Sequence, residues 1–308
     1  MRNECSLQLV NVNFSYDKKK SILINLNCIF KKGKITALLG ANGSGKTTLL
    51  KILTGILNPD TGYITLDSQK ITYSNNNYSY KKFLGYMPEY LEFYPEAILE
   101  DLLVFLSNIK GCTNKGVINY LLDVLNLNIY RHLKIKNLSK GTKQRVNLAQ
   151  AILTNPKVIV FDEPSNGFDC ISISVFYDII RKLADMGSIV ILSSHHLTEI
   201  YGRVDYLMFL DGGQIHKQLS CSSFFLSENK ATYIFIAFYF KECVSTSFIT
   251  SLQELDPNIE ARGMYIVQGK IKKNLLQTMF EMIAFEKLHI IDVYTKDSTI
   301  EDLMFNYE

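Results

Sequence analysis

The nine residues from Gly40 to Thr48 constrain the fold of this chain more than any other stretch. Their order, Gly-Ala-Asn-Gly-Ser-Gly-Lys-Thr-Thr, places three glycines ahead of a lysine and two threonines. The apolar run 35–39 before them is typical of a buried parallel strand, and the apolar residues from Leu49 to Leu57 after them recur at helical spacing. The sequence therefore predicts a strand, a glycine loop and a helix in direct succession.

This loop carries the groups that a polyphosphate requires, and its order fits the P-loop pattern G-x-x-x-x-G-K-[ST]. Successive backbone N–H groups of a glycine loop form an anion-binding concavity, and the positive end of the following helix points to the same place. Lys46 is expected to reach the β- and γ-phosphates of a bound triphosphate, and Thr47 to bind Mg²⁺ through its hydroxyl. The loop residues expected to bind nucleotide are Gly40, Asn42, Gly43, Ser44, Gly45, Lys46, Thr47 and Thr48.

Length, charge and cysteine usage narrow the class of protein. A chain of 308 residues accommodates one large domain or two ordinary ones, and its net charge of +3 is too small to indicate a nucleic-acid partner. No uncharged apolar run approaches the ~20 residues that span a bilayer, so a membrane pathway requires a separate protein. We see no secretory signal. The scattered cysteines favour a reducing cytoplasm over a disulfide framework or a zinc site; they are Cys5, Cys28, Cys112, Cys170, Cys221 and Cys243.

The remaining pattern predicts two domains. Helical spacing dominates from Pro95 to about Leu133, which indicates a helical subdomain near 90–140, whereas the polar stretch from Ser74 to Tyr80 is typical of a loop. After about residue 220 the composition shifts: strands are expected at 231–240, 259–268 and 288–294, and helices at 246–254 and 273–285. We therefore expect a nucleotide-binding domain over 1–218 and a small α/β accessory domain over 219–308.

An acidic pair follows a second buried strand. The run 158–161 is wholly apolar, and Asp162 and Glu163 come directly after it. In a P-loop enzyme, an aspartate that ends such a strand holds Mg²⁺. A neighbouring glutamate can accept a proton from the attacking water, which makes Glu163 the candidate general base.

Six short motifs together resemble those of the ABC ATPases, in family order, over about residues 5–218. The segment from Leu138 to Arg145, Leu-Ser-Lys-Gly-Thr-Lys-Gln-Arg, resembles the family's signature motif. The other matches are the P-loop, the segment 158–169, the aromatic Tyr16, the Q-loop position Glu89 and the switch histidine in Leu192-Ser193-Ser194-His195. The resemblance implies an α/β P-loop NTPase fold with an antiparallel β subdomain and a helical subdomain.

The resemblance also implies roles for individual residues. Tyr16 would stack on adenine, and His195 would contact the γ-phosphate and act with Glu163 and Lys46 in hydrolysis. Ser139 and Gly141 open a helix whose N-terminus would face the γ-phosphate bound by the opposite chain, because two such chains sandwich two ATP molecules head to tail. Asp169 would lie at that seam. His196, next to the switch histidine, is expected to be structural.

Three positions depart from the family pattern. Lys140 replaces the first glycine of the signature, and Thr142 stands where glutamine is common. Glu89 replaces the glutamine of the Q-loop, which removes an amide donor and adds negative charge near the metal. We still expect Glu89 to face the nucleotide and its Mg²⁺.

The favoured function is that of an ATP-hydrolysing transporter subunit that acts with a separate membrane permease. It would lie at the cytoplasmic face of the membrane as a homodimer without nucleic acid, and the permease would dock on residues 86–105, near Tyr90, Phe93 and Tyr94. The alternative for these three aromatic residues is burial in the helical subdomain. The small C-terminal α/β appendage, residues 220–308, ends in the segment 299–305 and resembles the tail of ATPases of ABC-2 type transporters, which favours export. The alternatives are a non-transport ABC ATPase of translation or DNA repair and a catalytically silent nucleotide-binding module.

Overall fold

The structure is a computed structural model with two compact units, Met1–Cys221 and Ser222–Glu308. The residues that it describes are 6–17, 20–71, 78–111, 115–168, 170–195, 200, 202–221 and 233–297. Among these residues, no helix combines the length and the apolar character that crossing a membrane requires.

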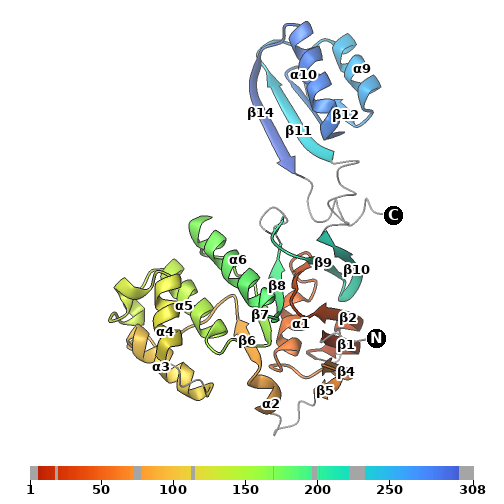
Figure 1. The fold of residues 1–308 in the computed structure, drawn as a ribbon. Helices are drawn as coiled ribbons and strands as arrows, with labels where there is room; N and C mark the ends of the chain where they lie inside the picture. The colour runs from red at the N-terminus through yellow and green to blue at the C-terminus, as the bar shows by residue number, and fades with distance from the viewer. Residues whose placement is uncertain are drawn as a thin grey trace. The chain divides into compact units, whose positions relative to one another are not determined.

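A six-stranded sheet in the order β10-β9-β3-β8-β7-β6 forms the centre of the first unit (Figure 1). Its strands are β3 (Ile35–Leu39), β6 (Leu84–Met87), β7 (Val158–Phe161), β8 (Ile189–Ser194), β9 (Tyr206–Asp211) and β10 (Gln214–Ser220). All neighbouring pairs are parallel except the hairpin of β9 and β10. Because parallel strands end at one edge of the sheet, the glycine loop, Asp162 and His195 are brought together there.

A second, antiparallel sheet in the order β2-β1-β4-β5 shares its core with the first. Its strands are β1 (Ser6–Ser15), β2 (Ser21–Lys31), β4 (Thr61–Leu66) and β5 (Gln69–Ile71). The helix α1 (Lys46–Leu53) buries Leu49 and Leu50 in this core, which also contains Leu7 of β1 and Val160 of β7. The core therefore holds the first turn of α1, and with it the glycine loop, between the two sheets.

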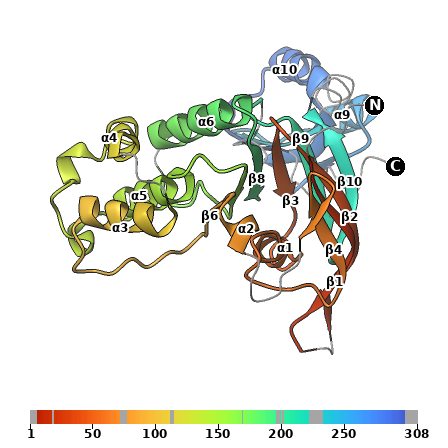
Figure 2. The same ribbon diagram turned by 60° about the horizontal axis from the view of Figure 1, so that its bottom comes forward.

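The first unit also contains helices, of which α3 packs against α4 and α5 (Figures 1 and 2). Their bounds are α2 (Tyr78–Lys81), α3 (Leu99–Ile109), α4 (Lys115–Val124), α5 (Lys140–Ile152) and α6 (Cys170–Asp185), with short 3₁₀ turns η1 (Asn128–Tyr130) and η2 (Ile135–Asn137). Within the described residues, α3, α4 and η1 confirm the predicted helical character between Pro95 and Leu133.

The second unit is an antiparallel sheet in the order β12-β13-β11-β14 with helices on one face. Its elements are β11 (Tyr233–Phe240), α9 (Thr246–Leu255), β12 (Ile259–Ala261), β13 (Ile266–Lys272), η3 (Lys273–Leu275), α10 (Leu276–Phe285) and β14 (Ile290–Asp297). Alternate residues of β11, such as Ile236 and Phe238, pack with Leu252 of α9 and Ile283 of α10. The unit thus has a hydrophobic core of its own.

The structure corrects three sequence expectations. The helix after the glycine loop ends at Leu53 and not near Leu57, because Gly55 adopts the left-handed conformation, with φ of +69°, that ends helices. Residues 78–81 form the helix α2, where a loop was expected up to Tyr80, whose buried hydroxyl donates to Leu53 O at 2.8 Å. The expected strand 259–268 is two strands, β12 and β13.

The end of α3 makes the stability of the protein depend on pH. Lys110 Nζ donates to the backbone oxygen of Gln150 and, at 3.2 Å, to its Oε1. Burial lowers the pKa of Lys110 to about 8 from its ordinary value of 10.5. Between these two values the unfolded chain binds more protons than the folded one, so the free energy of unfolding rises with pH.

We therefore expect the free energy of unfolding to gain ~1–2 kcal/mol from Lys110 between pH 8 and pH 10.5, an amount reduced for solvent screening. Urea unfolding of the parent and of Lys110→Met at both pH values measures the difference. Tyrosines and cysteines that titrate in the same window contribute to both proteins and cancel. An identical pH dependence in the two proteins would contradict this assignment.

Candidate active site

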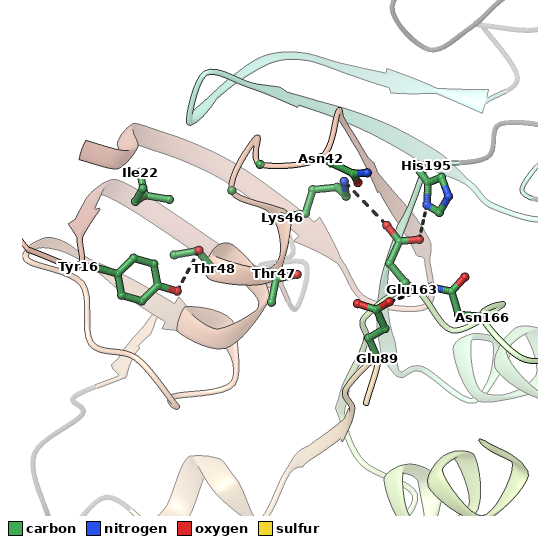
Figure 3. Close-up of a pocket in the computed structure, with 12 residues that line it drawn as sticks. Tyr16, Ile22, Asn42, Lys46, Thr47, Thr48, Glu89, Glu163, Asn166 and His195 are labelled. Atoms are coloured by element: carbon green, nitrogen blue, oxygen red, sulfur yellow. Dashed lines mark hydrogen bonds and ion pairs between the residues drawn. The ribbon is translucent and has the colours of Figure 1, made fainter. Parts of the chain in front are cut away.

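A pocket of about 480 Å³ lies at the carboxyl ends of β3, β7 and β8 (Figure 3). Its lining residues are Tyr16, Ile22, Asn42, Gly43, Gly45, Lys46, Thr47, Thr48, Glu89, Glu163, Asn166 and His195. Most of the residues predicted for the site line this pocket, although they come from segments far apart in the sequence. Among the described residues, the lining has one permanently cationic side chain, Lys46, and two carboxylates, Glu89 and Glu163.

Glycine is required at different positions of the loop for different structural reasons. Gly43 and Gly45 adopt left-handed φ angles of +83° and +107°, which glycine permits without steric cost. A Cβ on Gly40 would lie 2.2 Å from the carbonyl oxygen of Leu210, so this glycine allows the loop to approach β9. Ser44 is buried, and its Oγ has no hydrogen-bond partner among the described residues. Gly40 and Ser44 therefore lie outside the lining of the pocket.

Lys46 opens α1 and is held inside the loop. Its Nζ donates to the backbone oxygens of Gly40 at 2.8 Å and Ala41 at 3.2 Å, and it lies 3.8 Å from Glu163 Oε1. The side chain is buried. The loop thus fixes a positive charge at the floor of the pocket, where an anionic ligand would enter.

Oxygen donors meet beside Lys46. Thr47 Oγ1 donates to Asp162 Oδ1 at 3.3 Å, and Ser193 Oγ donates to the same oxygen at 2.8 Å. Burial raises the pKa of Asp162, while these hydrogen bonds oppose the rise. Carboxylate and hydroxyl oxygens are hard ligands that suit Mg²⁺, which takes one or two carboxylates together with substrate phosphates. The donor set of Thr47 and Asp162 therefore fits this metal.

Glu163 is fixed at its backbone and at both carboxylate oxygens. Its N–H donates to Ser193 Oγ at 2.8 Å, its Oε2 lies 2.8 Å from His195 Nδ1, and its Oε1 faces Lys46. Its φ of +45° is uncommon for a residue with a side chain and costs about 1 kcal/mol. A strained, buried carboxylate aimed into the pocket has the properties of a general base.

Glu89 lies across the pocket from the loop. Asn166 Nδ2 donates to Glu89 Oε1 at 3.0 Å, and the charge of Glu89, with a hydrogen bond, raises the pKa of the neighbouring Tyr90. The same charge contributes to the raised pKa of Asp162. The carboxylate at this position therefore makes the metal side of the pocket more negative than an amide would.

Tyr16 and Ile22 form the other end of the pocket (Figure 3). The Tyr16 ring is 61% exposed, and its hydroxyl lies 3.2 Å from Thr48 Oγ1 on α1. Its edge contacts Phe14, with 4.9 Å between ring centroids. An exposed aromatic ring held at two places provides a flat surface on which a base can stack.

Besides Gly40, Ser44 and Asp162, two further predicted residues lie away from this lining, and two others lie outside the described residues. Ser139 caps α5, since its Oγ accepts from Thr142 N at 3.2 Å, and a Cβ on Gly141 would lie 3.1 Å from Gly167 O. Neither residue lines the pocket of its own chain. Asp169 and His196 lie outside the described residues.

Sequence reasoning missed the apolar lining residue Ile22 and two polar residues of the site. Ser193 joins Asp162 and Glu163, and Asn166 holds Glu89. Both stand inside motifs that the sequence makes visible, and Ser193 is a polar residue in a buried strand, which is a signal for a hydrogen-bonding role. Their partners, however, lie 30 and 77 residues away in the chain.

A P-loop after β3, an acidic pair after β7 and a histidine after β8 define a nucleotide-hydrolysing P-loop ATPase. Comparison with known families matches residues 23–166 to the family described as ABC transporter. An ABC transporter ATP-binding protein of Methanocaldococcus jannaschii is 33% identical over 202 residues, which cover 65% of this chain and 72% of the relative. YhcH of Bacillus subtilis, of the same description, is 28% identical over 299 residues, 96% of this chain and 93% of its own.

A further relative is SrtF of Streptococcus pyogenes, a lantibiotic transport ATP-binding protein that is 31% identical over 209 residues, 68% of this chain and 88% of its own. Among solved structures, the ATP-binding subunit of an ABC transporter has a TM-score of 0.66 at 23% identity, covering 72% of this chain and 93% of that one. The chain belongs to the ABC transporter ATP-binding proteins. It binds nucleotide and hydrolyses ATP for transport.

Proposed function

We propose that this chain binds Mg-ATP in the described pocket and powers export through a separate permease, from the inner face of the cell membrane. The observation that carries the proposal is the position of Glu163, whose oxygens face Lys46 and His195 over the glycine loop. Bound Mg²⁺ would be held by Thr47 and Asp162 and would neutralise phosphate charge. Glu89 would join these ligands once its carboxylate leaves Asn166.

The chain's own residues divide the work of hydrolysis. Lys46 and the loop N–H groups bind the phosphates, and Tyr16 stacks on the base. Glu163 accepts the proton of the attacking water. His195 keeps the Glu163 carboxylate oriented through a hydrogen bond in which the ionised carboxylate accepts and the protonated Nδ1 donates. Ser139, Gly141 and Asp169 act on the nucleotide of the opposite chain.

Export and permease dependence rest on two supports. The C-terminal appendage, residues 220–308, resembles the tail of ATPases of ABC-2 type transporters, and SrtF, a relative, is named for lantibiotic transport. A homodimer is favoured because the chain carries a full set of site residues, and the net charge of +3 favours no nucleic-acid partner. We therefore expect the purified protein to carry no nucleic acid, at low salt as well as at high salt.

We expect the permease to dock on the exposed aromatic residues that follow Glu89. Tyr90 and Tyr94 are 75% and 71% exposed, whereas Phe93 is half-buried. Exposed surfaces on which aromatic rings gather mark binding sites. Replacing Tyr90 and Tyr94 by alanine should weaken copurification with the permease at least ~10-fold and uncouple transport, because such anchors carry 1–2 kcal/mol or more.

ATP binding by the isolated variant should be unchanged, since neither ring is needed to hold the phosphates. The matched control is Tyr120→Ala, which removes an exposed aromatic ring from α4. Unchanged copurification of the Tyr90/Tyr94 variant would place the docking site elsewhere.

A further inference from the structure

Two buried amides join α5 to the segment that leads into Glu89. Asn147 Nδ2 donates to Pro88 O at 2.9 Å, and Gln150 Nε2 donates to Tyr86 O at 2.6 Å. The two side chains also bond to each other, with Gln150 Nε2 3.2 Å from Asn147 Oδ1. Their exposed fractions are 1% and 8%. We call Asn147 and Gln150 the amide clamp.

The clamp occupies the open edge of the central sheet. β6 is the last strand of that sheet, and on its β7 side the carbonyls of Phe83 and Met87 accept hydrogen bonds. The alternate carbonyls of Tyr86 and Pro88 therefore point away from β7, where the described residues provide no further strand. The two amides take the place of that missing strand.

The backbones of β6 and α5 approach each other closely at this contact. A Cβ on Gly85 would lie 2.2 Å from Ala151 O, so β6 and α5 touch directly. On its other side Gln150 is held by Lys110 at the end of α3. Two buried amides are costly in a helix interior unless they are bonded, and here each amide nitrogen donates to a backbone carbonyl of the short segment 86–88.

The two ends of this joined body carry different parts of the site. The segment 86–88 runs into Glu89, which lines the pocket of its own chain. α5 begins after Ser139, whose partner under the proposed function is the nucleotide of the opposite chain. We propose that Asn147 and Gln150 are positioning residues that move Glu89 and the start of α5 as one body. The link to the opposite nucleotide rests on the proposed function, whereas the joining of α5 to β6 does not.

The test replaces both amides by leucine, which keeps side-chain volume and removes the donors. We expect kcat for ATP to fall at least ~10-fold while the KM for ATP changes less than ~2-fold, because the P-loop contacts remain. Gln218→Leu is the matched control, since Gln218 Nε2 also donates to a strand carbonyl, that of Ile29, at 3.0 Å, but away from β6. The control should keep the parent's kcat.

A distance between spin labels at Lys143 of α5 and Lys70 of β5 provides a second readout, which needs no hydrolysis. Without nucleotide, the parent should give one narrow distance and the double leucine variant a broadened one. With Mg-ATP, the parent's distance should shift and the variant's should not. Parent-like distances and kcat in the variant would overturn the proposal.

Two further results separate the possible failures. In one, the parent fails to bind Mg-ATP and still gives the narrow distance, with the broadened distance in the double leucine variant. That result would overturn the proposed function and leave the joining of α5 to β6 intact. If the double variant does not fold, Lys110→Met, which releases only the outer hold on Gln150, should give a smaller loss of kcat and a partly broadened distance. A Lys110→Met protein identical to the parent in both readouts would then overturn the proposal.

Discussion

Lys46→Ala is expected to abolish measurable ATP binding and to lower hydrolysis at least ~10²-fold, the loss typical of one preorganised charge at a transition state. Lys46 is the one permanent cation among the described residues that line the pocket. Its removal would also leave the buried Glu163 without the positive charge 3.8 Å away, which disfavours an anionic ligand further. Calorimetric titration with ATP and steady-state hydrolysis measure both effects.

The control for this change is Lys51→Ala, which removes a lysine from the last turn of the same helix. It should bind ATP as the parent does. ATP binding by Lys46→Ala within ~10-fold of the parent would mean that the loop N–H groups alone hold the phosphates, contrary to the proposed role of Lys46.

Glu163→Gln should lower kcat by ~10²–10⁴-fold and keep ATP binding, because the amide cannot accept a proton from water but fits the same space. Thermal unfolding with and without Mg-ATP, together with single-turnover hydrolysis, separates the two properties. The exposed Glu92, three residues after Glu89, offers the matched control Glu92→Gln, for which we expect no loss. Turnover by Glu163→Gln within ~10-fold of the parent would remove Glu163 from the role of base.

The motifs that sequence reasoning recovered share one property. In each of them the residue types stand close together in the chain, so that spacing alone reports on the chemistry. The glycine loop before Lys46 and the acidic pair after 158–161 are of this kind. The structure adds that Gly40 is required by the approach of β9 and that Glu163 is strained, both of which depend on backbone geometry.

The residues that sequence reasoning missed act across the fold. Ser193 reaches Asp162 and Glu163 only because β7 and β8 are neighbouring parallel strands. Asn147 and Gln150 read as interior positions of a helix, and their partners at 86 and 88 are identified only once β6 is known to be an edge strand. The early end of α1 has the same origin, since the left-handed φ of Gly55 overrides the apolar periodicity that continues to Leu57.

The central claim, a site completed by two chains around ATP, is tested most directly by the mass in solution of Glu163→Gln with and without Mg-ATP. The variant binds ATP and cannot hydrolyse it, so the ATP-bound dimer should accumulate. We predict a monomer without nucleotide and a dimer with Mg-ATP, a dimer that the further change Ser139→Ala should weaken. A monomer under both conditions, with ATP demonstrably bound, would contradict a homodimeric site.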